Sequence, residues 1–295
     1  MIINKYEFSI KNVLIKIIKR SPLIQFIAYK VRNTQYRLKT KNFSDSPKMF
    51  NYVEIETVNR CNYGCPFCPV NRKVDPREYK LMDESLFKKI IDDLEQLEYS
   101  GRLALHSNNE PFLDKRIESF AEIARKQLPK AYIFLYTNGS LLTVERLLKI
   151  IDNIDNIYID NYDDDLQMSE HVQTIYDYCL KDPKISPKIT VELRKQNEVL
   201  TTRGGQAPNN EKRKPISLKC IFPWQQVIIR PTGKVSLCCN DAHGKYTMGN
   251  VTNQTPAEVW NSAEFKEIRR RMKKQGRLGL DLCMFCDSHG LLTRF

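Results

Sequence analysis

From residue 52 onward, short apolar runs alternate with longer segments in which apolar residues recur every three or four positions. The runs are typical of buried strands, and the periodic segments are typical of helices with one apolar face. The predicted strands are Tyr52–Thr57, Leu103–His106, Ala131–Thr137, Ile157–Asp160 and part of Lys188–Leu200, and the predicted helices are Glu84–Leu97, Lys115–Gln127 and Val144–Ile151. This alternation predicts an α/β fold in which helices cover a parallel sheet and ligands gather where the strands end.

The last third of the chain has a different pattern. A polar stretch over residues 206–215 contains two prolines and marks a boundary. After it, Trp224–Arg230 and Lys234–Leu237 flank a Pro-Thr-Gly turn and predict a hairpin, and Pro256–Lys274 predicts one helix with Thr255 as its N-cap. We therefore expect a core domain over residues 51–215 and a smaller α+β module over residues 216–295.

The first 50 residues are a separate basic segment. They hold eleven Lys or Arg and two acidic residues, so +9 of the total charge of +12 lies there. Residues 8–38 predict two short amphipathic helices and residues 41–51 a linker, and no apolar run reaches the roughly 18 residues of a membrane span. The helices either lie on an anionic membrane surface or pack their apolar stripe on the rest of the protein. The nearly neutral remainder argues against a nucleic-acid partner.

Length and cysteine content narrow the class of protein. A chain of 295 residues with 41% apolar residues buries a large core. Its nine cysteines are an odd number, two groups of them have metal-type spacing, and no cleavable signal peptide is evident. These features favour free thiolates in a reducing cytoplasm over a disulfide framework.

Three cysteines follow the first predicted strand in the segment Cys61-Asn-Tyr-Gly-Cys65-Pro-Phe-Cys68. The spacing Cys-x3-Cys-x2-Cys supplies three thiolates to a [4Fe-4S] cluster and leaves one iron without a protein ligand. The open iron makes this loop the candidate centre of the chemistry.

A second group of cysteines lies in the last third. Cys220 precedes the predicted hairpin, Cys238 and Cys239 end it, and Cys283-x2-Cys286 follows the predicted helix. Four thiolates that converge in a small module suit either a fully ligated [4Fe-4S] cluster or a tetrahedral zinc. Spacing alone favours zinc, and the open-iron loop elsewhere in the chain shifts the balance toward a cluster.

The first loop resembles that of the radical S-adenosylmethionine (SAM) enzymes. The resemblance implies a partial (β/α)6 barrel in which the open iron chelates SAM. One electron, from a donor such as flavodoxin or ferredoxin, then splits SAM into methionine and a 5′-deoxyadenosyl radical that abstracts hydrogen atoms. The cofactor carries the difficult step, and the protein orients it.

The C-terminal segment resembles the SPASM and twitch modules of such enzymes. The matching motifs are Gly233-Lys-Val-Ser-Leu-Cys238, Met248-Gly-Asn-Val251, Glu258-Val-Trp260 and Cys283-Met-Phe-Cys286. A full SPASM module carries further cysteines after the last pair, and this sequence has none beyond Cys286. The resemblance therefore implies the shorter twitch form, with one auxiliary [4Fe-4S] cluster on Cys220, Cys238, Cys283 and Cys286.

Residues 52–286 also resemble the radical SAM dehydrogenases and epimerases of aminoglycoside biosynthesis, among them the dehydrogenase of 2-deoxy-scyllo-inosamine. The shared motifs are Glu54-Ile-Glu56, Glu110-Pro111, Tyr136-Thr-Asn-Gly139 and Arg203-Gly-Gly205. This resemblance implies oxidation of a secondary alcohol on a small polar sugar or cyclitol. The adenosyl radical removes the carbinol hydrogen, the hydroxyl loses its proton, and the remaining electron passes to the auxiliary cluster.

The resemblance also assigns cofactor-binding residues. Asn109, Glu110 and Pro111 are expected near the methionyl part of SAM, although the family has small residues before Glu-Pro where this chain has Ser107-Asn-Asn109. Asn138 and Gly139 are expected beside the ribose or methionine, unless they form an ordinary turn. His106 ends a predicted strand and is expected to face the same site.

Two further residues bear on the reaction. The resemblance places Arg203 beside the substrate hydroxyl, although its polar surroundings also suit a solvated loop residue. We expect it to orient the hydroxyl rather than to remove its proton, because the pKa of arginine lies above about 12. Cys239 leaves epimerisation as an alternative reaction, since a thiol there would return a hydrogen atom to the opposite face of the substrate carbon. Alternatively, Cys239 is a structural residue or a cluster ligand. Cys179 is assigned to the core.

Other functions compete with the dehydrogenase. Many SPASM relatives modify peptides, although no peptide-recognition domain is evident here. A hypothesis of another class is a non-catalytic metal-cluster scaffold docked on a membrane through residues 8–38. The open-iron motif argues against it.

Overall fold

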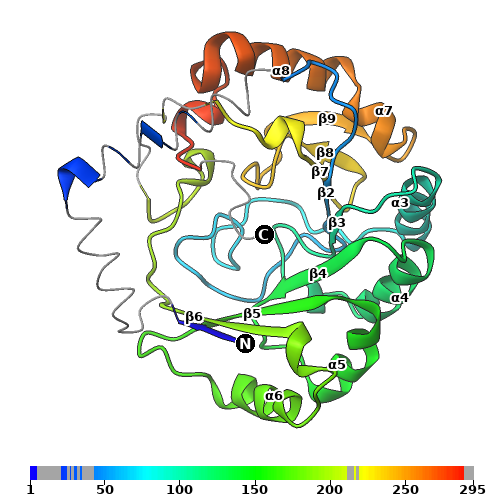
Figure 1. Ribbon diagram of the computed structural model, residues 1–295, viewed down its shortest axis with the longest axis vertical. Coiled ribbons are helices and arrows are strands. Elements are labelled where there is room, and N and C mark those ends of the chain that lie inside the picture. The colour runs from blue at the N-terminus through cyan, green and yellow to red at the C-terminus, as the bar shows by residue number, and fades with distance from the viewer. Residues whose placement is uncertain are drawn as a thin grey trace.

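A computed structural model describes residues 1–4, 21–24, 27, 30, 31, 34, 43–210, 216 and 219–288. These residues form a nine-stranded sheet in the order β1-β6-β5-β4-β3-β2-β7-β8-β9 (Figure 1). The strands from β1 to β7 in this order are all parallel to their neighbours, and β8 and β9 are antiparallel. The predicted helices over 8–38 fall largely outside the described residues.

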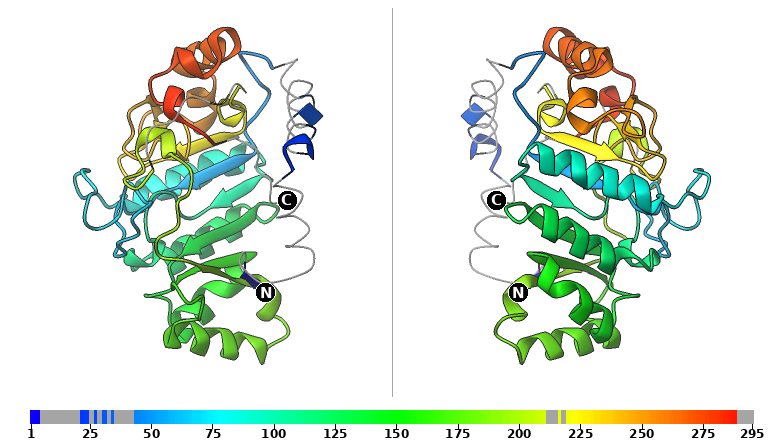
Figure 2. Two further views of the ribbon diagram at one scale, coloured as in Figure 1. Left: turned by 90° about the vertical axis from the view of Figure 1, so that its left-hand side faces the viewer. Right: turned by 90° about the vertical axis from the view of Figure 1, so that its right-hand side faces the viewer.

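The core of the fold alternates strands and helices as the sequence predicts. The strands are β2 (Tyr52–Ile55), β3 (Arg102–Ala104), β4 (Tyr132–Thr137), β5 (Asn156–Tyr162) and β6 (Ile189–Arg194), and the helices are α3 (Glu84–Gln96), α4 (Ile117–Gln127), α5 (Val144–Ile150) and α6 (Glu170–Leu180). The helices cover one face of the curved sheet (Figure 2). The expected α/β class is confirmed, and in the described part of this unit four helices alternate with the five parallel strands β2 to β6.

The N-terminal residues add an edge strand that the sequence reasoning missed. Strand β1 (Ile2–Asn4) runs parallel to β6, with Ile2 opposite Val191. The amino group of Met1 donates a hydrogen bond to the carbonyl oxygen of Ile189, at 2.6 Å. Three residues are too few to show strand periodicity, and this strand exists because β6 offers it unpaired backbone groups.

The C-terminal module extends the same sheet. Strand β7 (Gln226–Ile229) pairs with β2 in parallel, and β8 (Lys234–Ser236) forms the predicted hairpin with it. Strand β9 (Thr247–Asn250) was not predicted. The hydrogen bonds between β2 and β7 join the module to the core across the expected boundary at residues 215 and 216, so the two share one sheet.

The predicted helix over Pro256–Lys274 is in fact two helices, α7 (Pro256–Trp260) and α8 (Ala263–Gln275). Thr255 caps α7 as predicted, in a capping box with Glu258. The single-helix prediction was wrong because Ser262 acts as a second N-cap, its side chain accepting a hydrogen bond from the backbone N–H of Phe265 at 3.2 Å.

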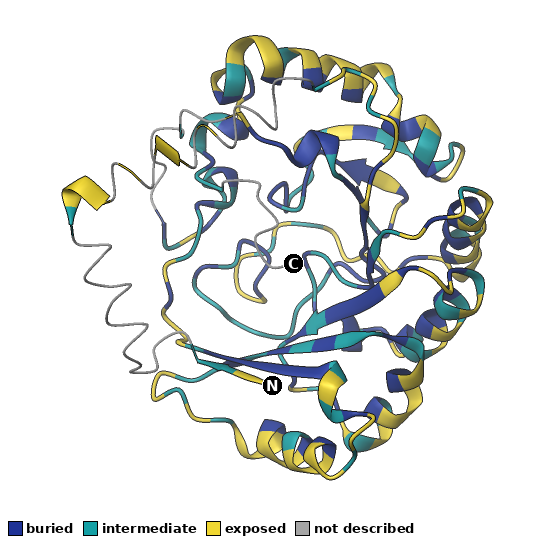
Figure 3. Cartoon of the chain, viewed as in Figure 1, coloured by how far each residue is buried: buried dark blue, intermediate teal, exposed yellow. Residues whose placement is uncertain are grey.

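Strand β2 shows how the sheet separates core from site. Val53 and Ile55 are fully buried in the main apolar core. The central strands of the sheet are coloured mostly as buried, whereas the helices alternate between buried and exposed residues (Figure 3). Tyr52 lies in a different cluster with Ala104, Phe134 and Ile228. Because side chains alternate along a strand, Glu54 and Glu56 share the face of Tyr52. Cys179 is buried in the main core, which confirms its assignment.

Candidate active site

The cysteine loop begins where β2 ends and is held closed by its own contacts. An antiparallel bridge joins Val58 to Leu81 at its base. Inside the loop, the Nδ2 of Asn71 donates to the carbonyl oxygens of Cys65 and Cys68, at 3.1 and 2.8 Å. These contacts fix the backbone that carries the cysteines.

Arg77 joins this loop to the ends of two strands, a role that the sequence reasoning did not foresee. Its buried guanidinium pairs with Glu56 at 2.9 Å and with Asp75 at 3.0 Å. It also donates to the carbonyl oxygens of Asn59, at 3.0 Å, and Asn108, at 2.9 Å. The arginine lies in a polar loop without periodicity, so only the fold reveals that it is buried and paired.

A cavity of about 550 Å³ lies over the loop, at the carboxyl ends of the strands. Its walls include seven of the predicted site residues, namely Cys61, Cys65, Cys68, Asn109, Glu110, Asn138 and Arg203. His106 also lines it, as expected, whereas Pro111, Gly139 and Cys239 are not part of the wall. The expectation that ligands gather at strand ends therefore matches where the hollow lies.

Glu110 holds the strand ends together. Its buried carboxylate accepts hydrogen bonds from the hydroxyl of Thr137 at 2.7 Å and from the backbone N–H groups of Asn138 at 2.8 Å and Phe112 at 3.1 Å. With these three donors the carboxylate is committed to the protein. Glu110 thus shapes the cavity by positioning Asn138, whose Nδ2 donates to the side-chain oxygen of Asn62 at 2.9 Å.

The cavity wall offers donor groups to a bound cofactor. The Nδ2 of Asn109 is buried and has no hydrogen-bond partner among the described residues. A buried donor without a partner is costly unless a ligand satisfies it. Asn109 therefore fits the carboxylate or amino-acid end of a molecule such as SAM.

The loop cysteines also fit a metal cluster. Burial raises the pKa of Cys61 and Cys65 to about 12, so their thiolates form only beside a strongly positive centre such as iron. In the described part of the chain, no three His, Cys, Asp or Glu side chains gather closely enough to hold a single metal ion.

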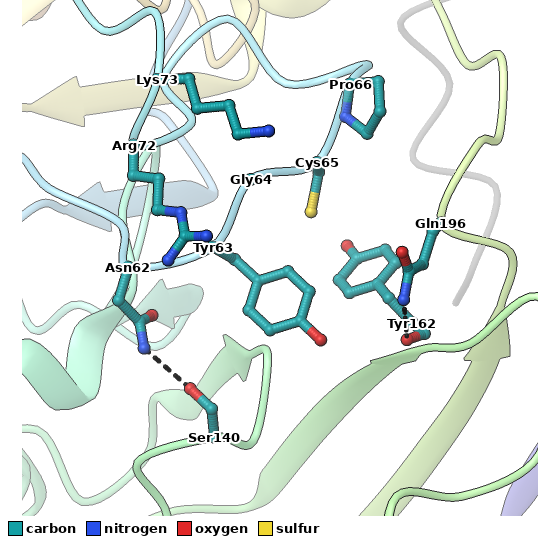
Figure 4. A pocket seen from close by; sticks show the side chains of 10 residues that line it. All are labelled: Asn62, Tyr63, Gly64, Cys65, Pro66, Arg72, Lys73, Ser140, Tyr162 and Gln196. Atoms are coloured by element: carbon teal, nitrogen blue, oxygen red, sulfur yellow. Dashed lines mark hydrogen bonds between the residues drawn. The ribbon is translucent and has the colours of Figure 1, made fainter.

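A second cavity, of about 490 Å³, adjoins the first along Tyr63, Cys65 and Tyr162, which line both (Figure 4). The side chains of Arg72 and Lys73 lie on one side of it. The cysteine loop thus borders a second cavity with two basic side chains as well as the main cavity.

The four other cysteines come together in the C-terminal module. Cys220, Cys238, Cys283 and Cys286 are each at most 7% exposed. Burial raises the pKa of Cys238 most, and the neighbouring thiols Cys239, Cys220, Cys283 and Cys286 raise it further. Closeness of four buried thiols suits a fully ligated cluster without room for a further ligand.

The comparisons with known proteins agree with this geometry. The radical SAM superfamily matches residues 55–179, and SPASM, an iron-sulfur cluster-binding domain, matches residues 220–287. The chain therefore contains a radical SAM domain followed by a SPASM iron-sulfur domain. This radical SAM enzyme accordingly uses SAM and iron-sulfur clusters, while the number of auxiliary clusters stays a prediction.

Several relatives resemble the radical SAM enzyme over most of their length. The S-adenosyl-L-methionine-dependent 2-deoxy-scyllo-inosamine dehydrogenase of Niallia circulans is 28% identical over 247 residues, which are 83% of this chain and 96% of the relative. The crystal structure of BtrN in complex with AdoMet and 2-DOIA has a TM-score of 0.72 at 27% identity, covering 82% of this chain and 94% of BtrN. The structure of anSMEcpe with bound AdoMet, at 13% identity, 81% and 88% coverage and a TM-score of 0.52, shares the fold alone.

Arg203 of the radical SAM enzyme stands in a turn built on the auxiliary cysteine segment. Residues 203–205 all have positive φ angles of 49°, 66° and 79°. A Cβ on Gly204 would lie 2.6 Å from the Cδ1 of Leu282, so only glycine allows this packing beside Cys283. The backbone N–H of Thr202 donates to Asp287 at 2.8 Å.

The guanidinium of Arg203 points toward the main cavity from this turn. It donates a hydrogen bond to the Oδ1 of Asn108, and its buried Nε has no partner among the described residues. Like the amide of Asn109, this nitrogen is available to a ligand. The predicted substrate-orienting arginine and the auxiliary cysteines therefore form one structural unit.

Arg277 is a second arginine that the sequence reasoning missed. It is 3% exposed and donates to the carbonyl oxygens of Cys286 at 3.4 Å and Ser288 at 2.5 Å. Burial raises the pKa of Cys220, and the charge of Arg277 offsets part of that rise. A buried cation thus lies against the auxiliary cysteines.

His106 and Tyr136 add aromatic rings to the lining of the main cavity. Tyr136 stacks on Tyr158 with a ring distance of 4.5 Å, and His106 lies against Tyr136 at 5.2 Å. Burial lowers the pKa of His106 to about 3, and its Nδ1 accepts a hydrogen bond from the backbone N–H of Tyr136 at 3.2 Å. His106 therefore stays uncharged at neutral pH.

Proposed function

We propose that this radical SAM enzyme oxidises a secondary alcohol of a small sugar or cyclitol to a ketone. The observation that carries the proposal is the shared construction of the substrate side and the auxiliary site, where Thr202 next to Arg203 is bonded to Asp287 next to Cys286. An electron acceptor built beside the substrate suits an oxidation. The similarity to a dehydrogenase of 2-deoxy-scyllo-inosamine supports the same reaction class.

The proposal assigns each cofactor to residues of the chain. Cys61, Cys65 and Cys68 would hold the SAM-binding cluster, Asn109 and Asn138 would contact SAM, and Cys220, Cys238, Cys283 and Cys286 would hold the auxiliary cluster. When bound, these groups supply a hydrogen-abstracting 5′-deoxyadenosyl radical and an acceptor for one electron. The fit rests on the buried thiols and on the unpaired Nδ2 of Asn109.

The protein's own part is to hold the alcohol in place. The Nε of Arg203 donates to the substrate hydroxyl, and the neutral ring of His106 and the stacked tyrosines offer an uncharged wall. A cavity of about 550 Å³ accommodates a small polar ligand together with SAM. The substrate class is thus a compact polyhydroxyl ring.

The test uses anaerobically reconstituted protein, reduced with dithionite and supplied with SAM and 2-deoxy-scyllo-inosamine or related amino-cyclitols in D2O. Mass spectrometry follows 5′-deoxyadenosine and the product. A product two mass units lighter identifies a ketone and supports the dehydrogenase. Cleavage of SAM without a lighter product from any alcohol contradicts it.

Epimerisation is the second candidate, because the environment of Cys239 suits a hydrogen donor. Burial, followed by the charge of Glu54, raises the pKa of Cys239, so that it remains a thiol at neutral pH. Its carbonyl oxygen accepts a hydrogen bond from the Nδ2 of Asn108 at 3.3 Å, close to Arg203. A product one mass unit heavier in D2O, lost in Cys239→Ala, favours this candidate; an unchanged C239A excludes it.

For the reducing partner, we propose an acidic electron carrier such as flavodoxin that docks at the second cavity. Arg72 and Lys73 supply a complementary charge beside Cys65. The double variant R72E/K73E is expected to slow reduction by flavodoxin, increasingly so at low salt, and to leave dithionite reduction unchanged. Equal slowing of both would indicate damage to the cysteine loop instead.

Contact with a membrane surface stays a proposal about the N-terminal segment. Leu23, Ile24, Ile27 and Val31 recur at helical spacing and are 40–68% exposed. No helix in the described residues is both long and apolar enough to cross a membrane. We expect the protein to sediment with anionic vesicles and the variant with these four residues changed to serine to remain in the supernatant; equal sedimentation would refute the contact.

A further inference from the structure

Oxidation of an alcohol requires a proton acceptor in addition to the radical. The carbinol carbon gives up a hydrogen atom, the hydroxyl gives up a proton, and one electron leaves as the C=O bond forms. An arginine side chain such as that of Arg203 is a poor proton acceptor, and the low pKa of His106 makes it a weak base. The acceptor must therefore be sought among the carboxylates.

The carboxylates that line the main cavity are engaged elsewhere. Glu110 accepts three hydrogen bonds from the protein. Asp160 pairs with Arg194 at 3.4 Å, and Asp287 accepts from the backbone N–H of Thr202 at 2.8 Å. Each of these carboxylates thus already accepts a hydrogen bond or an ion pair from the protein.

Glu54 lies directly behind the cavity wall on the side of Arg203. It is 5% exposed and stands on the concave face of β2. The hydroxyl of Ser107, which lines the cavity, donates to its Oε2 at 2.5 Å. Ser107 in turn accepts from the Nδ2 of Asn108 at 3.3 Å, and Asn108 accepts from Arg203. A connected path of short contacts thus runs from the arginine to the glutamate.

We infer that Ser107 and Glu54 form the proton relay of this reaction. The inference rests on the proposed oxidation. As the substrate O–H bond breaks, its proton moves to the Oγ of Ser107 while the proton of Ser107 moves to the Oε2 of Glu54. The hydrogen atom from carbon goes to the 5′-deoxyadenosyl radical, and the electron goes to an iron-sulfur acceptor. Glu54 ends protonated and later returns its proton to solvent.

The surroundings of Glu54 suit this task. Burial raises its pKa to about 7, while hydrogen bonds from Ser107 and Tyr52 and the charge of Arg203 limit the rise. Tyr52 and Cys239 also face Glu54 and stay uncharged near neutral pH, because burial raises the pKa of both groups. The remaining neighbour, Arg203, contributes a positive charge. Since the relay needs the carboxylate, ketone formation should rise with pH through about 7.

The test compares reconstituted wild type with Glu54→Gln on 2-deoxy-scyllo-inosamine deuterated at its carbinol carbons. E54Q is expected to lose roughly 10²-fold or more in ketone formation, the usual contribution of acid–base catalysis, together with the rise through pH 7. Deuterium should still enter 5′-deoxyadenosine, because hydrogen abstraction precedes proton loss. E54D keeps a carboxylate, and it should therefore restore part of the rate of ketone formation together with its rise with pH.

The matched control is Asp93→Asn, a buried carboxylate on the outer helix α3 that pairs with Lys89 at 2.7 Å. It should keep both rate and pH limb. Thermal unfolding at several pH values separates structural damage from loss of the relay. Ionisation of the buried Glu54 destabilises the wild type as the pH rises through its raised pKa, so the stability of E54Q relative to wild type should be greater at pH 8 than at pH 5. Ketone formation by E54Q with an unchanged pH limb overturns the relay. Absence of ketone from wild type on every alcohol overturns the proposed function instead.

Discussion

The two cysteine sites are assembled in opposite ways. The first takes all three thiols from one loop of eight residues, which stays partly exposed at two cavities. The second takes four buried thiols from three segments far apart in the sequence. Three thiolates leave one iron of a [4Fe-4S] cluster open to a ligand, whereas four thiolates would ligate every iron. The predicted openness of the first site therefore follows from how many thiols its loop supplies.

The largest expected effect comes from the open site. Cys65→Ala should abolish 5′-deoxyadenosine formation, because a cluster needs its third thiolate to be retained. The C-terminal thiols should still bind iron, measurable as residual iron and an EPR signal after reduction. Retention of SAM cleavage in C65A would contradict the assignment of the open iron to this loop.

The closed site should affect product rather than SAM cleavage. Cys283→Ala removes a buried ligand, and we expect uncoupled 5′-deoxyadenosine formation with little or no ketone. Quantitative mass spectrometry of both molecules checks the ratio. Loss of both together, with the fold intact by circular dichroism, would show that the two sites do not have separate roles.

The clamp on the open loop should be costly to break. Arg77→Ala leaves the buried Glu56 without its ion-pair partner and leaves Asp75 with only the longer contact to Arg60, at 3.5 Å; removing one member of a buried ion pair costs about 3–5 kcal/mol. Denaturant unfolding measures this loss. R270A, which removes an exposed pair with Glu267, is the control and should change the stability by at most about 1 kcal/mol.

The smallest effect concerns the closed site's charge. Arg277→Met removes a buried cation near Cys220, so the auxiliary cluster should become harder to reduce. We expect a midpoint shift to lower potential on the order of 59 mV, which is a tenfold change in a one-electron equilibrium. Potentiometric EPR titration checks it against R270M, whose exposed side chain should leave the potential unchanged. A shift in the opposite direction would contradict the role of the charge.

Elements with a clear apolar pattern or a flanking turn were predictable from the sequence, and elements without such a local signal were not. The helices α3, α4 and α5 begin and end close to their predicted bounds because each carries an apolar stripe of at least two turns. β1 and β9 have three or four residues and depend on a neighbouring strand. The break between α7 and α8 depends on the cap at Ser262, a signal shorter than the helical pattern around it.

The candidate site divides in the same way. The spacing of Cys61, Cys65 and Cys68 predicts the loop cysteines as cluster ligands, because the three recur within eight residues, whereas the C-terminal ligand set came from the resemblance to SPASM and twitch modules. Arg77, Arg277 and Ser107 stand in polar stretches that resemble solvent-exposed loops. Their burial and their partners appear only when segments distant in the sequence pack together.

The radical SAM motif and the α/β fold could thus be predicted from local sequence features. The motif lies in eight consecutive residues, and the fold follows from alternating apolar runs. The electrostatics of the site depend on the fold. Burial is the main cause of the pKa shifts at three groups, namely Glu54, His106 and Cys220. The burial of each group depends on side chains from several strands and loops that are distant in the sequence. A local sequence pattern therefore does not predict it.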